Sequence, residues 1–249
     1  MSNFLGRALG SGLLTRGEGF TDVWLVRHGQ QIRASKDSPE SIAYDAPLSD
    51  TGRAQAECTG RYLAGAGLDA VYASDLSRAK DTGAAIAAHH GVAPQVVEAV
   101  REIGIFRDVP LDRSFEEAVG AERARQAATD MVRDLTWDSV PLSEPSADFR
   151  ARVHGAVWEI ARAHPGQRVA IACHGGVVNA VLAQEYGLDR DFLFRPAHAG
   201  VTRVRFATGG ADGPSGALTS TEFPLPGERA IVLTANEIAH LEAEDLLTF

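Results

Sequence analysis

Two segments of the sequence share one organisation, in which a short apolar run ends at a histidine followed by glycine. Residues 23–26 lead into Arg27-His28-Gly29, and residues 169–173 lead into His174-Gly175-Gly176. Apolar runs rich in β-branched residues are typical of buried strands. In a parallel sheet the carboxyl ends of the strands share an edge, where ligands of α/β proteins bind. Both histidines are therefore expected at one edge of one sheet.

Segments with apolar residues at helical spacing lie between the strands. Ser49 is expected to cap one helix, and Ser74 or Asp75 the next. A third helix is expected over residues 149–160, where apolar residues recur every three or four positions. The other strand candidates are residues 69–73, 201–206 and 230–234. Alternating apolar and basic residues over 201–206 favour an edge strand.

This alternation of strands and helices predicts an α/β fold, a three-layer doubly wound sheet that is mostly parallel. The less regular stretch from about 103 to 145 predicts a small helical insertion over the active-site face, with Ser114 and Glu117 as a capping box. Residues 1–20, interrupted by glycines, are expected to form a flexible N-terminal arm. Residues 21–249 are expected to form a single domain.

Composition limits the classes of partner and the location. There are 24 Lys and Arg against 33 Asp and Glu, a formal net charge of -9, which argues against nucleic acid and anionic membranes as partners. No apolar run approaches the roughly 18 residues that a membrane-spanning helix needs. Cys58 and Cys173 lie far apart without CxxC spacing. This pattern favours a reducing, cytoplasmic location.

The residues after the two strands suit phosphoryl transfer. A transferring phosphoryl group spreads negative charge over its oxygens, so catalysis needs fixed cationic donors and an in-line nucleophile. His28 is the candidate nucleophile, because neutral imidazole attacks phosphorus near neutral pH. Arg27, Arg78 and His174 are the candidate phosphate-binding donors. Arg78 is expected in the first turn of a helix, where the helix dipole also favours an anion.

A phosphomonoester also needs a proton for its leaving oxygen, and the water that follows must lose one. A carboxylic acid with a raised pKa serves both steps. Glu102 is the candidate for this role. Taken singly, each of these five residues is more often a surface or core residue without catalytic function. Their joint pattern favours a site.

Five segments of the sequence, in the same order, resemble the histidine phosphatase superfamily in its phosphoglycerate-mutase-like branch. They are Leu25-Val26-Arg27-His28-Gly29-Gln30, Leu48-Ser49-Asp50-Thr51-Gly52-Arg53-Ala54, Tyr72-Ala73-Ser74-Asp75-Leu76-Ser77-Arg78-Ala79, Arg101-Glu102-Ile103-Gly104 and Ala172-Cys173-His174-Gly175-Gly176. The resemblance implies that His28 is phosphorylated, that Arg27, Arg78 and His174 bind phosphate, and that Glu102 is the acid. It implies no metal and no organic cofactor.

The sequence departs from the family pattern at Gln30, where glutamate is common, and at Ala34, where asparagine is frequent. The Glu102 segment also lacks the usual second glycine, and the insertion after it is short. The departures concern the substrate pocket more than the phosphate pocket. The Glu102 segment and the short insertion favour a phosphatase over a glycolytic mutase, with a small phosphorylated molecule as substrate.

Two alternatives remain open, a phosphoglycerate-type mutase and a non-catalytic protein that binds a phosphorylated ligand. The other histidines form no HExxH-type metal motif. His198 could approach the site from its loop, but its spacing does not require this, and it is left out of the catalytic set. The identity of the substrate and a possible homo-oligomer are also open.

Overall fold

The structure is a computed structural model that describes residues 20–33, 45–105, 114–208 and 229–249. The expected N-terminal arm, apart from Phe20, lies outside the described residues, as does Ala34. Among the described helices, none combines the length and the apolar character that would let it cross a bilayer.

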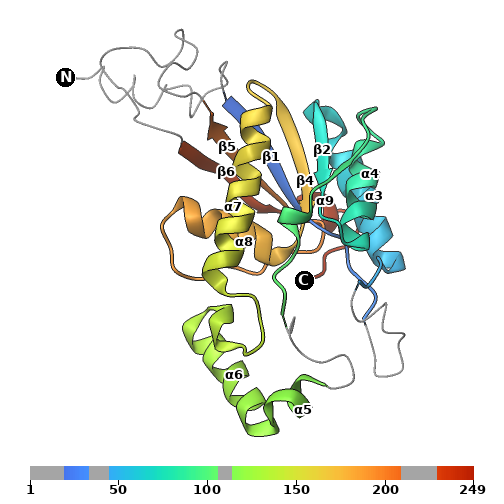
Figure 1. The fold of residues 1–249 in the computed structure, drawn as a ribbon. Helices are drawn as coiled ribbons and strands as arrows, with labels where there is room; N and C mark the ends of the chain where they lie inside the picture. Colours follow the sequence, from blue (N-terminus) through green and yellow to red (C-terminus); the bar gives the residue numbers. More distant parts are fainter. Residues whose placement is uncertain (1–19, 34–44, 106–113, 209–228) are drawn as a thin grey trace, which may run out of the picture.

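The described residues build a six-stranded sheet with the order β3-β2-β4-β1-β5-β6 (Figure 1). Its strands are β1 Phe20–Arg27, β2 Ala70–Ala73, β3 Gln95–Val96, β4 Arg168–Cys173, β5 Val201–Ala207 and β6 Arg229–Glu237. Only β5 runs against the others, so the expected mostly parallel sheet is confirmed. In the β1–β4 register, Arg27 lies opposite Cys173. The residues that follow, His28 and His174, therefore leave the sheet side by side.

The predicted edge position of residues 201–206 is wrong, because β5 lies between β1 and β6. Its basic residues are neutralised within the sheet. Asp22 of β1 accepts a hydrogen bond from Arg205 Nε at 2.6 Å and also binds Arg203, whose guanidinium lies over the Trp24 ring. Burial of arginine beside a paired carboxylate makes an interior strand resemble an edge strand in sequence.

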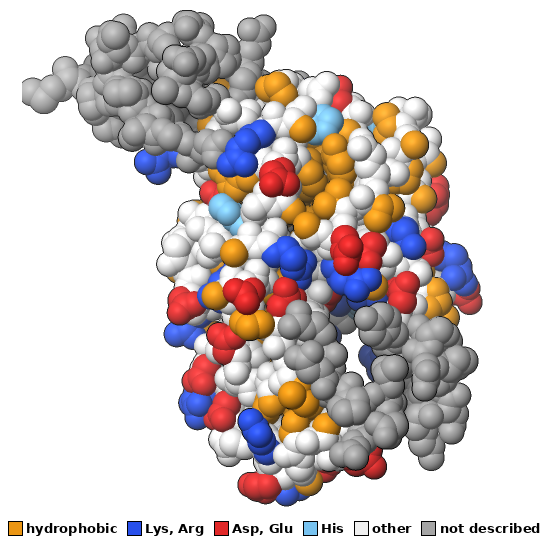
Figure 2. All heavy atoms as spheres, viewed as in Figure 1, with side chains coloured by type: hydrophobic (Ala, Val, Ile, Leu, Met, Phe, Trp, Pro, Cys, Tyr) orange, Lys and Arg blue, Asp and Glu red, His pale blue; other side chains and the backbone are white. Residues whose placement is uncertain are grey.

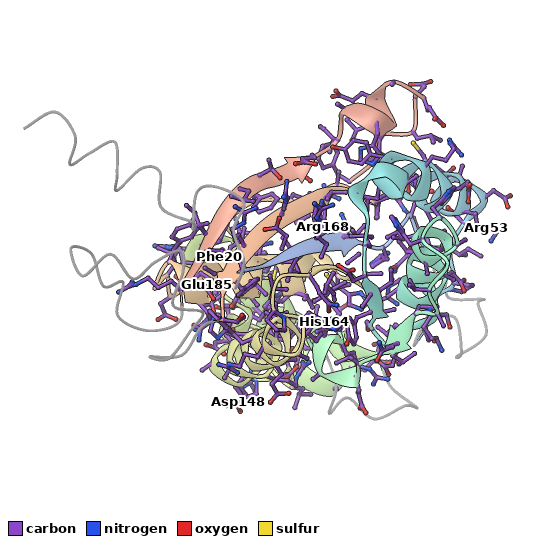
Figure 3. All side chains as sticks on the ribbon, turned by 90° about the horizontal axis from the view of Figure 1, so that it is seen from above. Phe20, Arg53, Asp148, His164, Arg168 and Glu185 are labelled. Atoms are coloured by element: carbon purple, nitrogen blue, oxygen red, sulfur yellow. The ribbon has the colours of Figure 1, made fainter. Side chains whose placement is uncertain are left out.

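Helices cover both faces of the sheet and complete the expected three layers. One face is covered by α3 Asp50–Leu63 and α4 Ser77–Ala87. The other face is covered by α7 Ser146–Ala163 and α8 Gly175–Glu185. Successive residues of β1 point to opposite layers, with Leu25 packed in the α7–α8 core and Trp24 in the α3–α4 core. The view from above separates Arg53 of α3 from Asp148 of α7 across the sheet (Figure 3).

Short elements complete the described chain. They are the 3-10 turns η1 Ala64–Ala66, η2 Glu98–Val100 and η3 Trp137–Ser139, and the helix α9 Ala239–Glu242. The turn η2 immediately precedes the Glu102 segment.

The expected insertion contains α5 Phe115–Val119 and α6 Ala121–Asp134, below the carboxyl ends of the strands in Figure 1. The Ser114–Glu117 capping box is confirmed. Ala127 is the only buried residue within these two helices. Charged side chains of both signs lie in this lower part of the molecule, with a group of hydrophobic side chains among them (Figure 2). Asp191, which accepts from Ser146 Oγ and Trp137 N, ties the connector after α6 to the body of the fold.

Candidate active site

His28 occupies the first position beyond β1 and is buried. Its backbone N–H donates to the Cys173 carbonyl of β4. Its Nδ1 lies 2.7 Å from the Gly29 carbonyl, and because a carbonyl only accepts, Nδ1 carries the proton. Nε2 therefore holds a lone pair, which receives a hydrogen bond from Arg78 Nε at 3.1 Å. Nε2 is the ring nitrogen able to attack phosphorus.

His174 lies beside His28 as the residue that opens α8. The two ring centroids are 5.1 Å apart in an edge arrangement. His174 Nε2 lies 2.8 Å from Ser74 Oγ, while the buried Nδ1 has no hydrogen-bond partner among the described residues. Buried polar atoms are nearly always paired. An unpaired nitrogen at this place suits a ligand that supplies the missing partner.

Both histidines are held in the neutral form. Burial, followed by the charges of neighbouring His174 and Arg78, keeps the pKa of His28 well below its ordinary range. Burial and the charges of Arg78 and Arg27 do the same to the pKa of His174. A neutral His28 is the form that acts as a nucleophile.

We expect the free energy of unfolding to increase as the pH rises from about 5 to 7. Below pH 6.5 the unfolded chain binds protons at His28 and His174 that the folded chain does not bind, which destabilises the fold by up to about 1.4 kcal/mol per histidine per pH unit. Glu102, whose pKa is raised by burial, acts in the opposite direction above its unfolded pKa.

Urea denaturation at pH 5, 6 and 7 measures this dependence. The His174→Asn variant should show a shallower rise than the natural chain, because one of the buried imidazoles is gone. An equal slope in both proteins would contradict the assignment of His174 as a buried neutral group.

Arg78 enters the site from the first turn of α4, as expected. The expected cap of α4 is wrong, since neither Ser74 nor Asp75 binds its first N–H groups. Ser74 is engaged with His174, and Asp75 forms an ion pair with Arg101. Asp45 takes the capping place instead, accepting from Ser77 N at 2.8 Å. Its carboxylate also lies 3.9 Å from Arg78 NH1.

Arg27 is anchored at two of its three guanidinium nitrogens. NH1 donates to the Pro196 carbonyl, and NH2 donates to His198 Nε2 at 2.9 Å. The buried Nε has no partner among the described residues and lies near the start of α8, because a Cβ on Gly175 would come within 3.7 Å of it. Burial lowers the pKa of Arg27 to about 10, so it is charged at neutral pH.

Glu102 is half-buried against the first turn of α8. Its Oε2 accepts from Gly176 N at 3.1 Å, and its Oε1 from Ile103 N at 3.1 Å. Burial raises the pKa of this carboxyl group, opposed in part by these bonds and by the charges of Arg78 and Arg27. A Cβ at Gly176 would lie 2.2 Å from Oε1. Glycine at position 176 therefore leaves room for the Glu102 carboxyl group.

Two glycines, Gly29 and Gly52, let the loop after His28 lie close against α3. A Cβ at Gly29 would lie 2.3 Å from the Gly52 carbonyl oxygen, and a Cβ at Gly52 would lie 1.9 Å from the Gln30 carbonyl oxygen. In both cases the added Cβ would meet backbone atoms, which cannot move aside as the end of a flexible side chain can. Ser49, the predicted cap of α3, accepts from Gly52 N, so the cap is confirmed.

The structure thus brings the five candidates to one edge of the sheet. Direct contacts join His28 to Arg78 and to His174, and Glu102 and Arg27 both lie against the start of α8. His198 joins them, although the sequence reasoning left it out. No group of three His, Cys, Asp or Glu suited to a metal ion occurs within residues 20–33, 45–105, 114–208 and 229–249.

Comparison with known proteins agrees with this fold. The family model of the histidine phosphatase superfamily (branch 1) matches residues 23–213. This chain belongs to that superfamily, and the expected family resemblance is confirmed.

Named relatives include both mutases and phosphatases. A probable phosphoglycerate mutase GpmB of Cronobacter sakazakii is 25% identical over 228 residues, covering 90% of this chain and 96% of that protein. Among solved structures, a mycobacterial glucosyl-3-phosphoglycerate phosphatase superposes with a TM-score of 0.66 at 20% identity, covering 87% of this chain and 99% of that one. A phosphoglycerate mutase from Bacillus anthracis superposes with a TM-score of 0.63 at 15% identity, covering 92% and 98%. The structural matches support the fold.

Proposed function

We propose that this protein is a phosphatase that hydrolyses a phosphomonoester through a phosphohistidine on His28. The observation that carries the proposal is the state of His28 Nε2, an unprotonated nitrogen with a guanidinium N–H aimed at it and a second imidazole beside it. A phosphoryl group at this nitrogen would meet cationic donors on more than one side.

The proposed reaction has two steps. In the first, His28 Nε2 forms a bond to phosphorus while the bond from phosphorus to the leaving oxygen breaks, and Glu102 gives that oxygen a proton. In the second, the Glu102 carboxylate takes a proton from water as the water oxygen attacks phosphorus, and the Nε2–phosphorus bond breaks. Arg27, Arg78 and His174 stabilise the charge on the transferring group in both steps.

A phosphoglycerate-type mutase is the second candidate, favoured by the name of the 25% identical relative. A mutase returns the phosphoryl group from histidine to another substrate oxygen and must keep water from it. The short insertion, in which only Ala127 of α5 and α6 is buried, supports the phosphatase.

A screen of small phosphomonoesters in the presence of EDTA tests the proposal. We expect phosphate release to continue in EDTA and a reaction quenched in alkaline denaturant to trap a labelled adduct that peptide mapping assigns to His28. Isomer formation without phosphate release would favour the mutase. Loss of turnover in EDTA would indicate a metallohydrolase, and thermal stabilisation by ligands without turnover would indicate a binding protein.

We also propose a small phosphorylated substrate and a cytoplasmic location. Cys58 and Cys173 are both free and buried, which suits a reducing compartment. A homo-oligomer remains a prediction.

A further inference from the structure

His198 contacts the signature arginine, although the reaction proposed above does not use it. It follows α8 in a loop before β5, and its backbone N–H donates to the Thr248 carbonyl. Its Nε2 lies 2.9 Å from Arg27 NH2, and its ring centroid lies 6.0 Å from that of His28. His198 is buried, with 7% of its surface exposed.

The direction of these hydrogen bonds is fixed by chemistry. A guanidinium group only donates, so His198 Nε2 must accept from Arg27. The proton of the neutral ring then resides on Nδ1, which lies 2.8 Å from Thr248 Oγ1 and donates to it. Burial, followed by the charge of Arg27, lowers the pKa of His198 to about 4, so the ring is neutral near pH 7. The hydroxyl of Thr248 thus accepts from Nδ1 and stabilises the tautomer whose Nε2 accepts from Arg27.

The side chain of Gln55 holds the Thr248 hydroxyl in place. Its Oε1 accepts from Gln30 N at 2.7 Å, which assigns the other end of the amide as the donor. Nε2 donates to Thr248 Oγ1 at 2.8 Å and to the Leu246 carbonyl at 2.7 Å. Gln55 is fully buried in α3. A continuous set of bonds therefore runs from the loop after His28, through α3 and residues 246–248, back to Arg27.

The backbone beside His198 is strained in support of this contact. Ala199 has a φ of 58°, a left-handed conformation that alanine rarely adopts. It is retained because Ala199 N donates to the Arg27 carbonyl at 3.0 Å and its own carbonyl accepts from Thr59 Oγ1. Strain that the surroundings maintain is frequent at functional sites.

We infer that His198 is a positioning residue for Arg27. Through its Nε2 lone pair, in the tautomer that Thr248 stabilises, it holds the guanidinium so that Nε faces the phosphoryl group at His28. Two of the three Arg27 nitrogens are then bound to protein, and the third is the one without a partner among the described residues. This role rests on the proposed phosphoryl-transfer function.

Variants of the full chain test the role. His198→Ala removes the acceptor, and His198→Gln offers an amide oxygen in its place. Thr248→Val keeps the shape of threonine but removes the oxygen that accepts from His198 Nδ1. We expect His198→Ala and Thr248→Val to weaken binding of inorganic phosphate, measured by calorimetry, about tenfold, and His198→Gln to restore most of it. Nitrogen-15 spectra of the histidine rings should show Nδ1–H at His198 in the natural chain and a tautomer mixture in Thr248→Val.

Controls separate positioning from folding. Thr129→Val changes an exposed residue of α6, and His89→Gln changes an exposed residue beyond the end of α4. Both should leave phosphate affinity unchanged. Thermal unfolding identifies any variant that has lost its fold. Equal phosphate affinity in the natural chain, His198→Ala and Thr248→Val would overturn the positioning role alone, as would a His198→Gln no better than His198→Ala. If the natural chain binds no phosphate, the proposed function and this role fall together.

Discussion

Alanine in place of His28 is expected to lower phosphate release from any good substrate by about 10⁴-fold or more and to remove the labelled adduct. The substitution deletes the Nε2 atom that would bond to phosphorus. Arg27, Arg78 and His174 stay in place, so binding of inorganic phosphate should persist. Steady-state phosphate release, alkaline-quench labelling and calorimetry on the same preparation separate chemistry from binding.

His89→Gln is the matched control for this substitution, because His89 lies beyond the end of α4 and pairs with Glu57. It should keep both turnover and the adduct. A His28→Ala protein that still forms a stable labelled adduct on another side chain would show that the nucleophile has been assigned wrongly. Such a result would leave the fold and the superfamily membership untouched.

Local patterns were sufficient to predict the framework of the fold. The strands before His28 and His174 were recognised because their apolar residues are consecutive, and the Ser49 cap because its partner, Gly52 N, is three residues away. The register between β1 and β4, which makes the two histidines neighbours, follows from the parallel pairing of two such strands. These features depend on interactions that are short in sequence or repeated along a strand.

The errors arise where a distant residue changes the role of a local signal. Ser74 and Asp75 have the right types for a helix cap, but His174 and Arg101 engage them, and Asp45 takes the place of the cap. These partners are between 26 and 100 residues away. Sequence spacing carries no information on such competition.

His198 shows the same limit at the site itself. It contacts Arg27 only because β5 pairs with β1 in antiparallel register and because residues 246–248 return to the same edge. The left-handed conformation of Ala199 has no signature in the sequence, because an alanine does not indicate a positive φ. Glu102, in contrast, was found through its place after the apolar turn Ala99-Val100-Arg101 and through the family motif.

The second large effect is expected at Glu102. Replacing it with glutamine should slow the phosphorylation of His28 by an alkyl phosphomonoester roughly 10³-fold, because the amide has no acidic proton for a strongly basic leaving oxygen. With p-nitrophenyl phosphate, whose leaving group departs as a stabilised anion, the same step should be much less affected. Rapid-quench measurement of adduct formation isolates this step from the later hydrolysis.

The pH dependence of this step provides an independent criterion. Burial raises the pKa of Glu102, so the protonated acid persists to higher pH than for an exposed carboxyl group, and phosphorylation by the alkyl substrate should fall as the pH rises through that pKa. In Glu102→Gln this fall should vanish. Glu98→Gln, an exposed change in η2 four residues earlier, should behave like the natural chain. Because the two substrates differ in their need for a proton, an equal loss for both would mean that Glu102 supports the structure of the α8 turn and is not the acid.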